Sequence, residues 1–302
     1  MVTVRQLRYF KALAETRHFG RAAQMCNISQ PALSMQIKEF EAELDVALIE
    51  QRKNGVRLTG DGEEVAERAG EILLKIRELE DIASDRGGEL GRKLSLGVIP
   101  TVAPYILPAA LPELQRRFPE LDLMLHEAQT AHLLDDVADG VLDVALLALP
   151  AGDERFDTEV LFEDRFLLAM PEGAPMPETI EVDELRAEKL ILLEEGHCLR
   201  DQALAVCGSV GEGEMAKFGA TSLTTVLQMV ANGYGSTLLP EMAVSVEVRP
   251  DTPLTLCHLE PEPARKVGLL WRSSDARPER FLRLGDVIRE VWRRNCPGHA
   301  TS

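Results

Sequence analysis

Two cysteine thiols stand nine positions apart, at Cys198 and Cys207, in the stretch LLEEGHCLRDQALAVCGSV. Thiols in such a place can pack in a core, bind a metal, act as nucleophiles or respond to oxidants. A zinc site is disfavoured, because zinc cysteines usually come in C-x₂₋₄-C pairs and only His197 stands close by. The remaining cysteines are interpreted as core residues, since unpaired cysteine is among the most buried residue types: Cys26, Cys257 and Cys296.

The first thiol of the pair is expected at the N-terminus of a helix. Cys198 follows the strand-like segment LILLEEG and opens the helix-like segment LRDQALAV. A helix dipole favours a thiolate at that end, and His197 and Arg200 can add positive charge or hydrogen bonds. A stabilised thiolate that solvent can reach is what an oxidation sensor requires.

The spacing of the two thiols limits how they could bond. If residues 198–207 are helical, nine residues rise about 13.5 Å and turn about 900°, which puts the thiols on opposite faces. A disulfide needs Cα atoms within about 7 Å, so bonding would require the segment to melt or fold back. The glycines of GSVGEGE give slack for such a change. Two incompatible local structures would make a two-state switch.

Charge is distributed unevenly along the 302 residues. Residues 1–60 hold nine Lys/Arg and six Asp/Glu, whereas the chain as a whole has a net charge of −17. A basic N-terminal unit on an acidic body is typical of a small DNA-binding domain joined to a sensor domain. No run approaches eighteen apolar residues and the N-terminus lacks the apolar core of a signal peptide, so we expect a cytoplasmic protein with reduced thiols and no membrane partner.

The first sixty residues carry the pattern of a helix-turn-helix. Leu7, Phe10, Leu13 and Ala14 fit one buried face, and Cys26-Asn27-Ile28 is interpreted as the turn. Ser29 is expected to cap the next helix, with Pro31 in its first turn. That helix has an apolar face of Leu33, Ile37, Phe40 and Leu44 and an opposite polar face of Gln30, Ser34, Gln36 and Lys38. Its polar residues could reach base edges in a major groove.

The segment RKNGVRLTG predicts a hairpin after this helix, because Asn-Gly favours a two-residue turn. Arg52, Lys53 and Arg57 would make it a basic wing suited to a phosphate backbone. An ordinary helical hairpin without DNA binding is the alternative that these residues alone leave open.

The register of alanines, turn and Ser-Gln-Pro in HFGRAAQMCNISQPALSMQIKEFEAEL resembles the winged helix-turn-helix of LysR-type transcriptional regulators over residues 3–63. The resemblance implies that Gln30, Pro31, Ser34 and Gln36 face DNA. We expect Met25, Ile28 and Leu33 in the core.

Residues 61–86 predict one long amphipathic helix with an apolar stripe of Val65, Ala69, Ile72, Ile76, Leu79 and Ile82. The small head offers no obvious partner for the stripe, so a second copy of the helix is the simplest one. The resemblance implies the same, namely a linker helix that dimerises the heads, and GGELG (87–91) is interpreted as a hinge.

From residue 93 onward, strand-like and helix-like segments alternate, which predicts an α/β domain with a mostly parallel sheet. Strands are expected at 93–100, 121–128, 144–149, 164–171, 189–193, 236–240 and 266–271, with helices notably at 104–117, 130–140 and 221–232. Thr101 and Thr130 each follow a strand directly, so both hydroxyls could face one crevice. The alternative is that each only caps the next helix.

The family resemblance implies a regulatory domain similar to periplasmic binding proteins, with two subdomains. The expected division is a winged helix-turn-helix at 1–60, a linker helix and hinge at 61–90, and a regulatory domain at 91–302. Subdomain I would comprise 91–163 and 268–302, and subdomain II 164–267.

Several segments resemble one branch of the family, the peroxide-sensing OxyR proteins: GVIPTVAPYILP, LHEAQT, LLEEGHCLRDQA, ATSLTTVLQMVANGYGSTLLPEMAV and PEPARKVGLLWR. This resemblance implies that Cys198 is oxidised by hydrogen peroxide to a sulfenic acid and that Cys207 resolves it as a reversible disulfide. It also implies a set of residues around the Cys198 pocket: Thr101, Thr130, His197, Arg200, Asp201 and Arg265.

The sequence is therefore interpreted as a transcription regulator without metal or organic cofactor and without enzyme activity. The partners that this interpretation implies are promoter DNA, further copies of the chain as a dimer of dimers (a homotetramer), hydrogen peroxide, a resetting thiol reductant and RNA polymerase. Two alternatives stay open: a LysR-type regulator that binds a small metabolite between its subdomains, and a thiol peroxidase.

Overall fold

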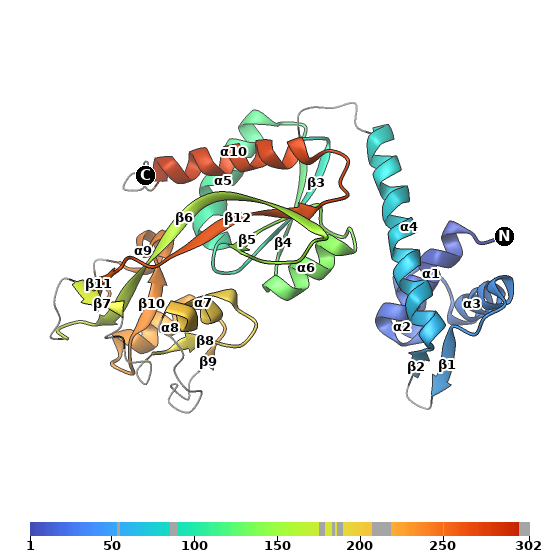
Figure 1. The fold of residues 1–302 in the computed structure, drawn as a ribbon, viewed down its shortest axis with the longest axis horizontal. Helices are drawn as coiled ribbons and strands as arrows, with labels where there is room; N and C mark the ends of the chain where they lie inside the picture. Colours follow the sequence, from blue (N-terminus) through green and yellow to red (C-terminus); the bar gives the residue numbers. More distant parts are fainter. Residues whose placement is uncertain are drawn as a thin grey trace. The chain divides into compact units, whose positions relative to one another are not determined.

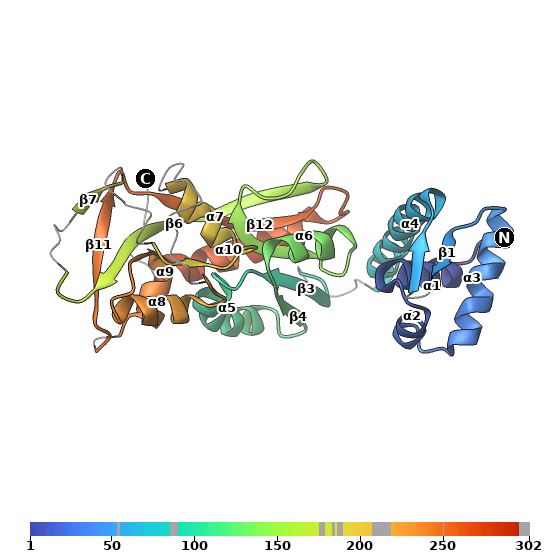
Figure 2. The ribbon, with the colours of Figure 1, turned by 90° about the horizontal axis from the view of Figure 1, so that it is seen from below.

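The computed structural model describes residues 1–52, 55–84, 90–174, 179–182, 185, 190–206, 219–249 and 251–295. The chain divides into two compact units, Met1–Asp85 and Arg86–Ser302, and each is described by itself (Figures 1 and 2). In the described part of the chain, no helix is long and apolar enough to cross a membrane. Cys207 and Lys53 lie outside the described residues.

The first unit, called the head below, begins with a bundle of three helices: α1 (Val4–Thr16), α2 (Phe19–Met25) and α3 (Gln30–Leu44). Their ends have clear local causes. Thr3 and Gln6 form a capping box at the start of α1, and Ser29 caps α3 by accepting from the Ala32 amide at 3.4 Å. Asn27 takes a positive φ of 53° in the turn between α2 and α3. The predicted helix-turn-helix is confirmed.

The core of the head is built on the periodic residues of α1 and α3. Leu7, Phe10, Leu13 and Ala14 are buried, as are Leu33, Ile37 and Phe40, and the rings of Phe10 and Phe40 are 5.5 Å apart. The prediction of Met25 as a core residue is wrong, because its side chain is 59% exposed. Helix α2 is only seven residues long and turns Ala22 and Ala23 inward, which leaves Met25 at its solvent edge.

The wing is an antiparallel pair of strands, β1 (Ile49–Arg52) and β2 (Gly55–Leu58), with Glu50 opposite Arg57. Gly55 has a φ of 134°, and a Cβ there would lie 2.7 Å from the carbonyl oxygen of Arg17. The next amide, Val56, donates to that same oxygen at 2.9 Å. Glycine is therefore needed where the hairpin passes the end of α1.

Helix α4 (Gly60–Ser84) corrects the expectation that its apolar stripe has no partner in the head. Its first turns pack on α1, with Ala69 buried and Val65, Ala66 and Leu73 packed against the core of the head. The helix continues past the bundle (Figure 1). Ile72 and Leu79, seven residues apart on the edge of the stripe, are 47% and 66% exposed. The head thus covers one part of the apolar surface of α4 and leaves a narrow strip open.

The second unit is organised around an eight-stranded sheet in the described part of the chain, in the order β4-β3-β5-β12-β6-β11-β7 with β10 also paired to β6. Its strands are β3 (Lys93–Val98), β4 (Asp122–Glu127), β5 (Val144–Leu149), β6 (Phe156–Pro171), β7 (Thr179–Glu181), β10 (Thr237–Pro240), β11 (Leu254–Glu260) and β12 (Ala264–Arg272). Two further short strands, β8 (Leu192–Leu193) and β9 (Gly219–Ala220), pair in parallel with each other.

The expectation of a mostly parallel sheet is wrong. The strands β3, β4 and β5 run parallel, but β12 is antiparallel to both β5 and β6, and β10 and β11 are antiparallel to β6. The long strand β6 and its partner β12 pass between the two halves of the unit (Figure 1). The result is a mixed sheet whose centre is antiparallel.

Two hydrophobic cores lie along these crossing strands. The first gathers residues from 90–162 and 267–292 together with Met242, and the second gathers residues from 166–259. Helices α5 (Ala103–Arg117), α6 (Thr130–Ala138) and α10 (Pro278–Asn295) belong to the first core, and α7 (Cys198–Val206) and α8 (Leu223–Ala231) to the second. Helix α9 (Glu241–Glu247) gives Met242 to the first core and Ala243 to the second.

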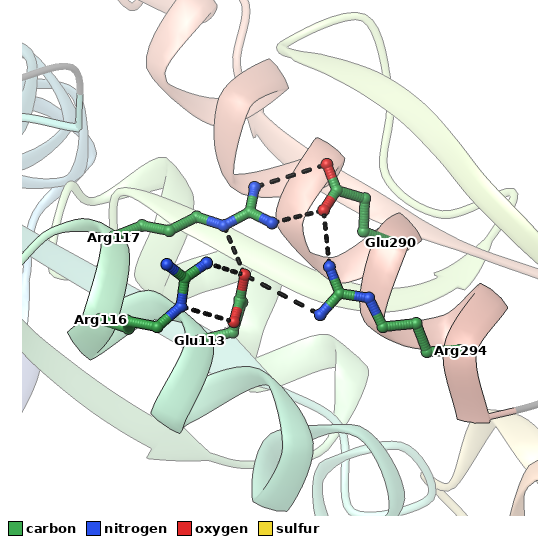
Figure 3. Close-up of polar contacts among 5 residues, drawn as sticks. All are labelled: Glu113, Arg116, Arg117, Glu290 and Arg294. Atoms are coloured by element: carbon green, nitrogen blue, oxygen red, sulfur yellow. Dashed lines mark hydrogen bonds and ion pairs between the residues drawn. The ribbon is translucent and has the colours of Figure 1, made fainter.

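Helices α5 and α10 are joined at the surface by a cluster of charges (Figure 3). Arg117 pairs with both Glu113, at 2.6 Å, and Glu290, and Arg294 bonds to Glu290 at 3.3 Å. The hydrogen bonds from Arg116 and Arg117 hold the pKa of Glu113 down to about 2. The cluster fixes α10 on α5. None of its residues lines the crevice beside Cys198 that is described below.

Candidate functional site: a crevice beside Cys198 and a helix-turn-helix surface

Helix α7 begins at Cys198, so the thiol stands at the helix N-terminus. The approach to it depends on Gly196, which has a φ of 90°. This left-handed φ favours glycine, and a Cβ at that position would also lie 2.6 Å from the side-chain oxygen of Gln129, which would then have to move. His197 follows with its side chain buried, and Cys198 itself is half-buried.

The thiol lies where the two hydrophobic cores meet. Cys198 packs against the first core, whereas its neighbour Leu199 belongs to the second. A small crevice opens there, and its lining comes from three separate segments: Ile99, Pro100 and Thr101 after β3, Gln129 and Thr130 before and at the start of α6, and Gly196, His197 and Cys198 before and at the start of α7. No space in this crevice admits a water-sized sphere.

The two threonines of the crevice differ in their hydrogen bonding. Thr101 is 3% exposed, and its hydroxyl oxygen accepts from Arg265 Nη1 at 3.1 Å. The hydroxyl of Thr130 is shielded from solvent and has no hydrogen-bond partner among the described residues. An unpaired buried hydroxyl is unfavourable, so the crevice offers a polar group that a small hydroxylic molecule could satisfy.

Arg265 holds Thr101, one of the residues that line the crevice. Its guanidinium donates to Asp164 Oδ2 from Nε at 2.9 Å and to the Thr101 carbonyl from Nη2 at 2.9 Å. Both members of the Asp164–Arg265 pair have fully buried side chains. The predicted residues Thr101, Thr130, His197, Cys198 and Arg265 therefore come together.

The structure does not bring Arg200 and Asp201 into the lining of the crevice. Arg200 is half-buried and donates to the carbonyl of Leu193 at 3.1 Å, which ties α7 to the preceding strand. Asp201 is exposed in the first turn of α7, where a carboxylate suits the helix dipole. A supporting role for these two residues stays a prediction.

The other described thiols differ from Cys198 in their surroundings. Cys257 is buried, and burial raises the pKa of its thiol. Cys26 is half-buried in the head, where burial, with a smaller contribution from Glu15, raises the pKa of the thiol. A raised pKa leaves less thiolate at neutral pH, so both thiols are poorer nucleophiles than an ordinary exposed cysteine. Among the residues that the structure describes, no three His, Cys, Asp or Glu side chains are placed to hold a metal ion.

A candidate DNA-binding surface lies on the head, on α3 and the wing. Gln30, Pro31 and Lys38 are exposed on α3, Ser34 is half-buried, and Arg57 is exposed on β2. Gln36 is half-buried and its amide donates to Glu39 at 2.5 Å, so this side chain is already paired. Arg52 ends β1, and Lys53 lies outside the described residues.

Sequence reasoning missed three residues of these sites. Gln129 and Asp164 stand in ordinary polar contexts, and their importance comes from contacts with Gly196 and Arg265 far along the chain. Met35 is 55% exposed and lies on the side of α3 opposite its buried face. Counting only polar residues on that face overlooked Met35, although the helical period places it there.

Two family patterns match the chain. The bacterial regulatory helix-turn-helix pattern of the lysR family matches residues 4–63, and the LysR substrate-binding domain pattern matches residues 87–293. The chain belongs to the LysR family of bacterial helix-turn-helix regulators.

Individual relatives narrow the likeness further. The DNA-binding transcriptional dual regulator OxyR of Escherichia coli K12 is 42% identical over 290 residues, which cover 95% of each chain. A probable hydrogen peroxide-inducible genes activator of Streptomyces viridosporus is 42% identical over 292 residues, covering 95% of this chain and 94% of that protein.

Solved structures agree with these relatives. Full-length OxyR of Pseudomonas aeruginosa carrying a cysteine-to-aspartate change matches with a TM-score of 0.76 and 35% identity over 96% of this chain and 95% of that one. A cysteine-to-serine mutant of Corynebacterium glutamicum OxyR with bound H2O2 matches with a TM-score of 0.65 and 34% identity over 99% of both chains.

Proposed function

We propose that this protein is a DNA-binding transcription regulator that senses hydrogen peroxide through Cys198. The observation that carries the proposal is the place of this thiol, at the N-terminus of α7 and in one crevice with Thr101 and Thr130. The likeness to OxyR over 95% of the chain supports the same conclusion.

The proposed first step is the attack of the Cys198 thiolate on one oxygen of hydrogen peroxide. An S–O bond forms while the O–O bond breaks, so the sulfur loses two electrons and the peroxide gains them. The leaving oxygen departs as hydroxide and takes up the proton that the thiol released, which gives a sulfenic acid and water. Hydroxyl groups of the crevice can hold the peroxide and stabilise the leaving oxygen.

In the proposed second step the Cys207 thiolate attacks the sulfur of the sulfenic acid. The S–S bond forms and the S–O bond breaks; the oxygen leaves as hydroxide and takes up the proton that the Cys207 thiol released, which gives water. Helix α7 covers Cys198–Val206, so the Cα atoms of these two residues, eight positions apart, are separated by about 12 Å along the axis. A disulfide allows about 7 Å, so its formation requires α7 to unfold or bend. A thiol reductant would reset the switch.

The change in α7 would reach DNA through the oligomer. We propose a dimer that forms through α4, supported by the exposed strip of Ile72 and Leu79, and a homotetramer made of two such dimers. The oxidised assembly would engage promoter DNA and RNA polymerase differently from the reduced one, in a cytoplasm that keeps the resting thiols reduced. The division into residues 1–60, 61–90 and 91–302 is part of the same proposal.

A metabolite-binding regulator is less well supported than a peroxide sensor. Pockets for small metabolites usually enclose about 300–1,000 Å³, whereas the crevice beside Cys198 has no room for a water-sized sphere. Hydrogen peroxide has only two heavy atoms, so it needs a far smaller opening of the crevice than a metabolite does. The thiol peroxidase alternative leaves the helix-turn-helix without a role.

The experiment that tests the proposed function adds one equivalent of hydrogen peroxide to reduced protein and records both thiol loss and the DNA footprint. We expect loss of two thiols and a changed footprint, both restored by dithiothreitol. Steady peroxide turnover with a thiol reductant and an unchanged footprint would instead favour the enzyme.

The basic wing gives a prediction about DNA affinity. Arg57 is exposed on β2, and we expect Arg57→Ala to weaken binding to all sequences and to reduce the salt slope of log K by about 1, as for a lost phosphate contact. Titrations at several salt concentrations measure both quantities. The matched change Gln30→Ala should instead alter sequence preference; an unchanged affinity and footprint for Gln30→Ala would contradict the assigned recognition face.

A further inference from the structure

Asp164 is a fully buried carboxylate that the proposed chemistry has not yet used. It stands on β6 directly opposite Arg265 on β12, where the two strands pass between the cores. Its Oδ2 accepts from Arg265 Nε at 2.9 Å, and its Oδ1 accepts from the Met242 amide at 3.0 Å. Burial raises the pKa of this carboxyl, and the adjacent guanidinium works against that rise. Both oxygens are thus fixed by donors.

The far side of Arg265 reaches the crevice. Nη1 donates to the Thr101 hydroxyl oxygen at 3.1 Å and Nη2 donates to the Thr101 carbonyl at 2.9 Å. A guanidinium can only donate hydrogen bonds, so the Thr101 oxygen acts as the acceptor towards it. The hydrogen of the Thr101 hydroxyl is then free to point elsewhere, and Thr101 lines the crevice together with Cys198.

We propose that Asp164 is a positioning residue for the reduction of peroxide at Cys198, because it fixes Arg265 so that the Thr101 hydroxyl donates into the crevice. The inference rests on the proposed function and deepens it. As the O–O bond breaks, negative charge grows on the leaving oxygen while the sulfur is oxidised by two electrons. A hydroxyl already aimed at that oxygen stabilises the charge without reorganising, and the oxygen leaves as hydroxide that is protonated to water.

The geometry of the chain favours this role over simple packing. A buried ion pair often stabilises a fold no better than apolar side chains of similar size. This pair, however, belongs to a chain of hydrogen bonds that leads to the crevice. The Met242 amide holds Asp164, Asp164 holds Arg265, and Arg265 donates to the Thr101 hydroxyl oxygen. An asparagine at position 164 would offer one acceptor oxygen to two donors, so its NH2 group would face either Arg265 Nε or the Met242 amide. The neutral side chain would also lose the charge that holds the guanidinium, and Arg265 would shift.

The experiment compares two reactions of Cys198 in full-length reduced protein. Stopped-flow oxidation by hydrogen peroxide reports O–O cleavage, and alkylation by iodoacetamide reports only the supply and access of the thiolate. For Asp164→Asn we expect peroxide oxidation about tenfold slower, with alkylation changed less than about twofold. A change that merely loosened the fold would affect both reactions.

Coupling to Thr101 is the sharper readout. If Asp164 acts through Thr101, the double variant Asp164→Asn/Thr101→Val should react no more slowly than Thr101→Val alone. Multiplicative losses in the double variant would show that Asp164 does not act through Thr101 and would overturn the inference.

Removal of one partner of a buried pair can unfold a protein, so a second variant is needed. Asp164→Glu keeps the charge and shifts the carboxylate, and we expect the same split between peroxide oxidation and alkylation. Should Asp164→Asn fail to fold, Asp164→Glu decides alone, and a wild-type peroxide rate would refute the proposal. The matched control is Asp275→Asn, which disturbs the buried contact between Asp275 and Arg272. Arg272 lies on β12 seven residues beyond Arg265, so the two arginines are about 23 Å apart. It should leave both rates unchanged.

The wild-type protein separates this inference from the proposed function. If Cys198 of the wild type reacts with peroxide no faster than free cysteine, the proposed function fails. If the wild type reacts fast and both Asp164 variants keep its rate, only the role of Asp164 fails.

Discussion

Cys198→Ser is expected to slow the reaction with hydrogen peroxide by more than about a thousandfold, which corresponds to roughly 4 kcal/mol in the barrier. Serine has no sulfur atom to be oxidised to a sulfenic acid, and its hydroxyl is a far weaker nucleophile than a thiol. The measurement is competitive consumption of peroxide or stopped-flow fluorescence on reduced protein.

Two other variants complete this test. Cys207→Ser should still form a sulfenic acid at Cys198 that a dimedone probe traps, but no disulfide within the chain. Cys257→Ser is the matched control, since that thiol is buried and its pKa is raised, and it should react like wild type. Rapid consumption of one equivalent of peroxide at Cys207 in Cys198→Ser protein would reverse the roles of the two thiols.

Ile72→Asp is expected to weaken dimerisation by at least about a hundredfold and to abolish tight operator binding. Ile72 is 47% exposed in the isolated head, so the head should stay folded when aspartate replaces it. At a dimer seam on α4 the same carboxylate would lose its hydration without gaining a partner, a cost of several kcal/mol. Sedimentation velocity and DNA titration measure the two effects.

Position 72 separates dimerisation from folding better than its neighbours do. Ala69 is buried in the core of the head, and Ile76 lines the groove between α1 and α4, so charges at either would disturb the head itself. Glu67→Lys, on the exposed polar side of α4, is the matched control and should stay dimeric. An intact dimer with unchanged DNA affinity in Ile72→Asp would rule out the α4 interface.

The helices and the turn of the head could be read from the sequence because their signals are local. The period of Leu33, Ile37 and Phe40 and the cap at Ser29 each act within a few residues of their position. Met25 was misjudged because helix propensity and period do not show where a seven-residue helix leaves the core. The covered half of α4 was missed because its contact is with α1, some sixty residues earlier in the chain.

In the second unit, strand positions were more predictable than strand directions. The segments at β3, β4 and β5 are apolar runs and were found, but the first half of β6, FDTEVLFE, mixes exposed acidic residues with buried ones. The antiparallel pairing of β12 with β5 and β6 joins segments about a hundred residues apart, and no local pattern encodes it.

The crevice shows the same division. The place of Cys198 at the start of α7 follows from its local sequence, and the strand ends bring Thr101 and Thr130 into one crevice with it. Asp164, by contrast, stands in the surface-like sequence FEDRF and is buried only because β12 sets Arg265 opposite it.

The most direct test of the account is peptide mapping by mass spectrometry of reduced protein before and after one equivalent of hydrogen peroxide, with DNA footprinting of both samples. For a peroxide switch at Cys198 we expect a single new disulfide between the peptides that contain Cys198 and Cys207, a footprint that changes with it, and reversal of both by dithiothreitol. A changed footprint with both thiols still free, or a disulfide that leaves the footprint unchanged, would contradict it.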